Sequence, residues 1–190
     1  LFHSTEGYIS SSRNEMSRMV AAEAIRSVSQ NLVTAIREPE NLEAMGKVAF
    51  GSYLSGIQMV VGSCTSAHPL EHALSAYHGM LPHGAGLIMI AEAFYGTFIQ
   101  KHVCDDCFIE MAQMMGMEEA DRPEDFLTAL TKLFDDCGVA NLKMSDYGIK
   151  PEEFPKMLQN ARDTLGVNFL NDPCPLTDEE YVAIYQKSYR

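Results

Sequence analysis

Apolar residues recur along most of this chain at the three- and four-residue spacing of amphipathic helices, and alternating runs of β-branched residues are nearly absent. The first such stretch covers residues 16–37, and Pro39 ends it. Further helices are predicted near residues 40–61, 87–99, 107–115, 123–136 and 152–165, with a loop over 145–150. A last helix opens at Thr177, because Thr177 and Glu180 have the spacing of a capping box. The pattern predicts an all-α, multi-helix, bundle-like fold.

The stretch 40–61 differs from the other predicted helices in its many small side chains. These are Ala44, Gly46, Ala49, Gly51, Ser52, Ser55 and Gly56. Small residues let neighbouring backbones approach closely, so we expect a buried helix packed tightly on its neighbours. Because the chain shows no internal repeat and no low-complexity linker, residues 1–190 are interpreted as one helical domain.

The net charge and the number of cysteines limit which binding partners and which cellular compartment are expected. The net charge of -12 argues against nucleic acid and against an anionic membrane surface as partners. No apolar run reaches the roughly 18 residues of a membrane span. Five cysteines, an odd number without framework spacing, favour a reducing compartment, and we expect a cytoplasmic protein. Cys104 and Cys107 form an isolated pair without a second pair or a preceding strand, and are interpreted as ordinary helix cysteines.

The histidines are the most concentrated group of chemically reactive side chains in the chain. Four of the six lie within residues 68–83. His68 and His72 are four residues apart, so on a helix they share one face. A corner over 79–82 lets His83 fold back beside them. His83 follows a proline at an expected helix start, where the helix dipole disfavours imidazolium and keeps a lone pair free. Converging neutral histidines of this kind predict an Fe²⁺ or Zn²⁺ site.

The same residues allow two other interpretations. The run from His68 through Glu71 to His72 fits the H-x-x-E-H pattern of inverted zinc peptidases. His68 and His72 would then bind zinc and Glu71 would be the general base, provided that the helix starts close to Pro69. The third interpretation is a non-enzymatic helical metal-binding or interaction module, in which the histidines need not converge.

Three parts of the chain together resemble the iron-containing (group III) alcohol dehydrogenases. The segment 56–86 resembles their signature, above all in His68-x-x-x-His72-Ala-Leu-Ser-Ala and in Pro82-His83-Gly84-Ala85-Gly86. Residues 1–10 look like the family segment that carries an Asp-x-x-x-His pair, and residues 125–139 with the final helix are similar to its C-terminal helices. The resemblance implies an all-α C-terminal domain that faces a Rossmann-like nucleotide-binding domain across the active-site cleft.

The resemblance also implies roles for individual residues. His3, His68 and His83 match the three histidines that hold the family's metal, and His72 matches a histidine beside the nicotinamide and substrate, which we expect to be catalytic as a proton relay. The family's aspartate ligand would stand four residues before His3, outside this chain. His68 and His83 are 15 positions apart, one more than the commoner family spacing, and the corner over 79–82 can absorb the extra residue.

The activity implied by the resemblance is hydride transfer between NAD or NADP and a small alcohol or aldehyde, with Fe²⁺ or Zn²⁺ as Lewis acid. No Gly-rich turn follows a strand within residues 1–190, so the nucleotide-binding half is expected upstream of this chain. We therefore expect a fragment that carries the metal side of an enzyme, is inactive alone, and belongs to a homo-oligomer.

Overall fold

The computed structural model describes residues 1–190 as helices joined by short connections, without strands. The helices are α1 (Phe2–Ile9), α2 (Glu15–Ser29), α3 (Leu32–Arg37), α4 (Leu42–Val61), α5 (Ala67–Tyr77), α6 (His83–Gln100), α7 (Asp105–Met114), α8 (Glu124–Asp136), α9 (Phe154–Leu165) and α10 (Asp178–Ser188). Short 3₁₀ segments η1 (Met144–Tyr147), η2 (Pro151–Glu153) and η3 (Gly166–Asn171) lie between the later helices. The predicted all-α fold is confirmed. None of the helices is both long and apolar enough to cross a membrane.

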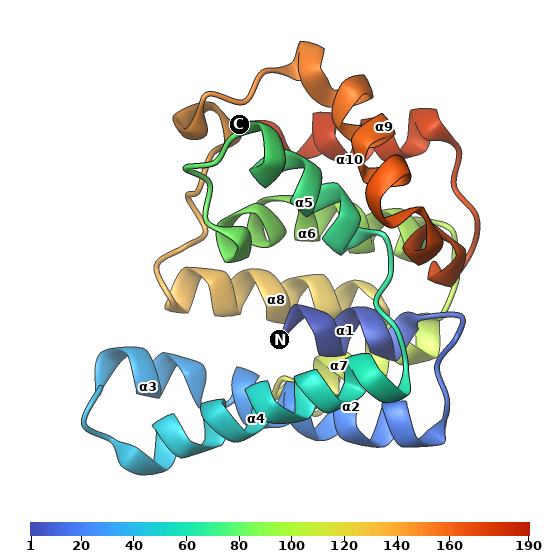
Figure 1. Cartoon of the computed structure of the whole chain (residues 1–190). Helices are drawn as coiled ribbons and strands as arrows, with labels where there is room; N and C mark the ends of the chain where they lie inside the picture. Colours follow the sequence, from blue (N-terminus) through green and yellow to red (C-terminus); the bar gives the residue numbers. More distant parts are fainter.

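The helices form two groups that meet at α1 (Figure 1). One group contains α2, α3, α4 and α7, and the other contains α5, α6, α9 and α10, with α8 packed against both α6 and α7. The aromatic centre of the core lies where these groups meet, with the ring of Tyr95 edge-on to Phe108 and Phe126. Thr5 of α1 is 2.7 Å from the buried hydroxyl of Tyr95, so the first helix is tied directly to this core.

Helix α5 begins where its proline is tolerated. Pro69 is the third residue of the helix, a position whose backbone N–H would have no partner inside the helix. The residue before the helix, Ser66, donates hydrogen bonds from its backbone and hydroxyl to the buried carboxylate of Asp172, at 2.8 and 2.7 Å. The hydroxyl of Tyr185 donates to the Leu70 carbonyl at 2.6 Å. The start of α5, and therefore His68, is held by the C-terminal part of the chain.

The single helix predicted over 16–37 is wrong, because the structure divides it into α2 and α3. The break lies at Asn31, whose side chain donates to the carbonyl of Ser27 at 3.0 Å. Asparagine side chains compete in this way with backbone hydrogen bonds, which the apolar spacing does not reveal. Helix α1 was not predicted, since Ser4 and Thr5 are buried and give it no apolar stripe. The predicted loop 145–150 contains most of η1.

The prediction for residues 40–61 is right about close packing and wrong about burial. A Cβ atom on Gly51 would lie 2.7 Å from a methyl group of Val28, so α4 and α2 approach closely at this glycine. The opposite face of α4 is exposed, including Leu42, Tyr53 and Val60 at 82, 66 and 84%. Ser55, on the buried side of α4, lies 2.7 Å from Ser4 of α1, so the small residues serve contacts with two helices while α4 itself lies at the surface.

Candidate metal centre

Four imidazole rings from three helices lie side by side. His3 comes from α1, His68 and His72 come from α5, and His83 is the first residue of α6. The ring centroids of His3 and His68 are 4.3 Å apart and the rings are nearly parallel. The His83 ring lies 5.3 Å from His68 and 5.1 Å from His72, and His72 lies 6.0 Å from His68. The structure thus brings together the four histidines singled out from the sequence.

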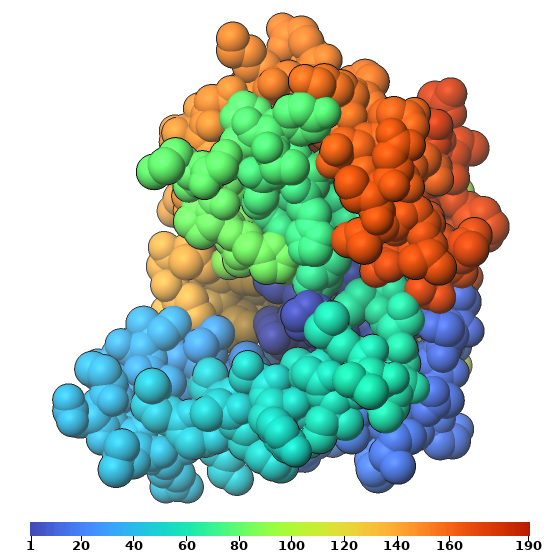
Figure 2. Space-filling model, viewed as in Figure 1, coloured from blue at the N-terminus to red at the C-terminus, as the bar shows by residue number.

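The row of rings runs from the interior to the surface. His68 is 5% exposed, His3 is half-buried, and His72 and His83 are exposed. Figure 2 shows the surface hollowed between the green region of α5 and α6 and the cyan helix α4, with blue residues of the chain start at its floor. The elements that carry the histidines border this hollow, so a bound ligand could reach the rings from solvent.

A buried carboxylate from α1 orients His68. Glu6 is fully buried, and one of its oxygens accepts hydrogen bonds from the backbone and hydroxyl of Thr65, at 3.1 and 2.9 Å. Its other oxygen contacts Nδ1 of His68. With Nδ1 engaged, Nε2 is the ring nitrogen left to bind an ion. Sequence reasoning missed Glu6, because nothing in its spacing distinguishes a buried carboxylate from an exposed one.

A second buried carboxylate orients His83 in the same way. Glu71 of α5 is fully buried, contacts Nδ1 of His83 with one oxygen, and accepts a hydrogen bond from Ser75 with the other. Gly86 makes room for this carboxylate, because a Cβ atom there would lie 2.6 Å from Cγ and Oε1 of Glu71. The sequence analysis singled out Glu71 as the general base of a zinc peptidase, and the contact with His83 depends on how the corner between α5 and α6 folds.

Burial and neighbouring charges shift the pKa values of three histidines in this row. Burial, and then the neighbouring His68, lower the pKa of His3 to about 4, so His3 is neutral near pH 7. Burial also lowers the pKa of His72, although the charge of Glu71 opposes it. Burial would lower the pKa of His68, but the charge and hydrogen bond of Glu6 outweigh it and the pKa is raised. Neutral His3 and His72 keep a lone pair for a metal or a proton.

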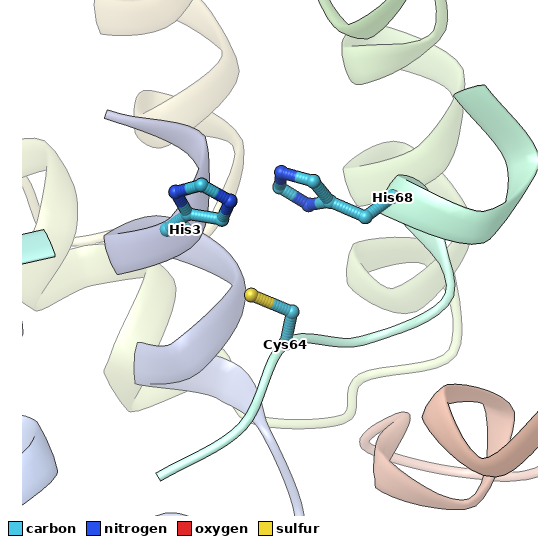
Figure 3. A group of neighbouring side chains, drawn as sticks. All are labelled: His3, Cys64 and His68. Atoms are coloured by element: carbon cyan, nitrogen blue, oxygen red, sulfur yellow. The ribbon is translucent and has the colours of Figure 1, made fainter. Parts of the chain in front are cut away.

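A cysteine that the sequence analysis did not single out lies beside the row. The Cys64 sulfur and ring nitrogens of His3 and His68 all lie within 4.8 Å of one another (Figure 3). Glu71, His72 and His83 form a second group of that kind. The two groups adjoin, because the rings of His68 and His83 are neighbours.

These residues fit a divalent transition-metal ion. Imidazole nitrogens are donors that Fe²⁺ and Zn²⁺ accept readily. Metal-binding histidines usually donate their second ring nitrogen to a carboxylate or carbonyl, and His68 and His83 each have such a carboxylate. The buried carboxylates also place negative charge next to the rings, which favours a bound cation.

The zinc-peptidase interpretation is not favoured by this arrangement. Its general base would be Glu71, but that carboxylate is fully buried and both of its oxygens are engaged, by Ser75 and His83. A general base needs an oxygen within reach of a water molecule. The close packing of the rings also disfavours an interaction module with unrelated histidines.

Residues 1–189 match the family model for the C-terminal part of the Fe-containing alcohol dehydrogenase family. Over its full length the chain is 28% identical to 1,3-propanediol dehydrogenase of Klebsiella pneumoniae and 26% identical to a long-chain primary alcohol dehydrogenase of Thermoanaerobacter ethanolicus. It covers 49% and 48% of those two proteins. The chain therefore spans about half the length of the curated relatives it matches.

The fold is similarly related to solved structures. A 1,3-propanediol oxidoreductase superimposes with a TM-score of 0.89 at 25% identity, over 99% of this chain and 49% of that protein. An archaeal alcohol dehydrogenase from a Red Sea brine pool superimposes with a TM-score of 0.91 at 20% identity, over 98% of this chain and 48% of that one. The second likeness concerns the fold alone.

Proposed function

Because the chain belongs to the iron-containing alcohol dehydrogenase family, we propose that it forms the metal and substrate side of an active site that transfers hydride between NAD(P) and an alcohol or aldehyde. The observation that carries this proposal is that the rings of His3 and His83, which come from two other helices, each pack against the ring of His68. NAD or NADP would bind a nucleotide-binding half that lies outside residues 1–190. Small alcohols and aldehydes are the proposed substrates, in keeping with the hollow that the start of the chain, α4, α5 and α6 border (Figure 2).

In this proposal His3, His68 and His83 hold an Fe²⁺ or Zn²⁺ ion. When bound, the ion supplies Lewis-acid chemistry, because it polarises the substrate oxygen and stabilises negative charge there. Glu6 and Glu71 hold His68 and His83 by Nδ1, so Nε2 of each ring would be the nitrogen left free to bind the ion. An aspartate upstream of His3, as in the family pattern, would complete the set.

His72 is the proposed proton relay. It is exposed, its pKa is lowered by burial of part of its ring, and its ring adjoins that of His83. A neutral imidazole at this position can accept the hydroxyl proton of an alcohol at a ring nitrogen while the hydride leaves for NAD(P)⁺. In aldehyde reduction the same nitrogen returns the proton.

The test is NAD(P)-dependent oxidation of short primary alcohols with added Fe²⁺ or Zn²⁺, for this chain alone and for the chain joined to its nucleotide-binding half. We expect turnover only from the joined protein. There, His72→Ala should lower turnover by roughly 10²–10⁴-fold and change the pH profile, as loss of a general acid–base does. Robust turnover by residues 1–190 alone would contradict the proposal that a separate nucleotide-binding half is required for activity.

A further inference from the structure

The thiol of Cys64 lies at the buried end of the histidine row. Its sulfur and ring nitrogens of His3 and His68 lie within 4.8 Å of one another, and Figure 3 shows the three side chains gathered between α1 and the segment that leads into α5. Cys64 is 6% exposed, and its sulfur makes no hydrogen bond. The donor atom is therefore buried, unpartnered and next to two imidazoles.

The backbone on both sides of Cys64 is held in place. On one side, Asn171 donates to the Ser63 hydroxyl at 2.7 Å and to the Cys64 carbonyl at 3.3 Å. On the other, Thr65 donates twice to Glu6, the carboxylate that also contacts His68. One buried carboxylate thus fixes both the ring of His68 and the residue that follows the thiol. The sulfur is positioned relative to the imidazole before any ligand binds.

We propose that Cys64 is a sulfur ligand of the metal ion that His3 and His68 hold. The inference rests on the proposed function, since it concerns the same ion, and it adds a donor that the histidine pattern does not contain. Binding would release the thiol proton to solvent and leave a thiolate on the cation. The resulting His–His–Cys face, extended by His83, favours softer divalent ions such as Zn²⁺ over harder ones such as Mn²⁺.

The competing role for Cys64 is packing alone, since free cysteines are commonly buried as small apolar groups. Packing does not require the sulfur to adjoin two imidazole nitrogens. Cys107 illustrates the difference, because it is equally buried, at 4%, among the apolar residues of the core. It therefore provides a matched control for Cys64.

The test is titration of the metal-free chain with Co²⁺, followed by absorption spectroscopy. A thiolate ligand gives an intense sulfur-to-cobalt charge-transfer band in the near ultraviolet, whereas imidazole ligands alone give only the weaker visible bands. We expect the charge-transfer band to grow until the site is full. Cys64→Ser should abolish it and weaken Co²⁺ binding about tenfold or more, while Cys107→Ser should retain it.

The wild-type spectrum alone can overturn the inference, even if a variant fails to fold. Visible bands without a charge-transfer band would mean that Co²⁺ binds the histidines only, which removes Cys64 as a ligand and leaves the proposed function intact. A charge-transfer band that survives in folded Cys64→Ser would also remove Cys64. Absence of any Co²⁺ binding would contradict both this inference and the metal site of the proposed function.

Discussion

The carboxylate of Glu71 on α5 contacts Nδ1 of His83, the first residue of α6, across the corner that separates the two helices. This contact decides which nitrogen of His83 remains free, and it ties the exposed ring to a fully buried group. Glu6 does the same for His68 from α1. His68 and His83 are therefore each held in position by a carboxylate on the side of the ring that faces away from solvent.

Replacing Glu71 by glutamine tests this positioning. The amide keeps the volume of the side chain but removes the negative charge opposite His83, so we expect Zn²⁺ affinity to fall about 10–100-fold. Zn²⁺ affinity can be measured by competition with a chelating dye. Glu92→Gln, which changes an exposed carboxylate on the same helix as His83, is the control and should bind as wild type. Equal affinity in both variants would show that Glu71 does not support the site.

A second test enlarges Gly86, which faces Glu71. The Cβ atom of Gly86→Ala would lie 2.6 Å from the Glu71 side chain, so the buried carboxylate must shift. We expect weaker Zn²⁺ binding and a loss of about 1–3 kcal/mol in the free energy of unfolding. Gly84→Ala is the matched control, because its Cβ atom meets nothing within 4 Å, and alanine favours a helix by roughly 0.5–1 kcal/mol over glycine. Denaturant unfolding of the two variants should therefore shift in opposite directions.

A third prediction concerns pH and the anchor of α5. Burial raises the pKa of Asp172 from its ordinary value of 3.8 to about 6, against hydrogen bonds from Tyr181 and Ser66 that lower it. The folded state thus holds the proton more tightly than the unfolded state. The stability that Asp172 contributes is complete below about pH 4 and is lost as the pH rises through about 6.

Asp172→Asn replaces the titrating carboxyl group by an amide, so the variant should lack the corresponding pH dependence. Between about pH 4 and pH 7 the free energy of unfolding of the wild type should fall relative to the variant by on the order of 2–3 kcal/mol. Denaturant unfolding at several pH values measures this difference. A difference that stays constant across the range, or that grows in favour of the wild type with rising pH, would contradict the raised pKa.

The histidine motif was predictable because its signal is local. His68 and His72 are one helical turn apart, and a proline corner precedes His83, so spacing alone placed them together. The helices with clear apolar periodicity were found for the same reason. Thr177 and Glu180 also form the predicted capping box at the start of α10.

The partners of the histidines were not predictable, because they depend on contacts between distant segments. The buried carboxylate of Glu6 contacts Thr65 and His68, about sixty positions further along the chain. The segment of Cys64 is likewise fixed by Asn171, more than a hundred positions later, which donates to the Cys64 carbonyl. No periodicity in the sequence indicates such contacts. From the sequence alone, a polar residue that tertiary packing buries therefore cannot be distinguished from an exposed one.

The central claim is that His3, His68 and His83 bind one ion and that His72 does not. The most direct measurement is the metal content of the purified chain after loading with Zn²⁺ and dialysis, for wild type, His68→Ala, His72→Ala and His83→Ala, with helical content checked by circular dichroism. We expect one ion per chain in the wild type and in His72→Ala, and a large loss in His68→Ala and His83→Ala. If His72→Ala loses its metal as completely as His68→Ala while His83→Ala keeps it, the assignment of ligands is wrong.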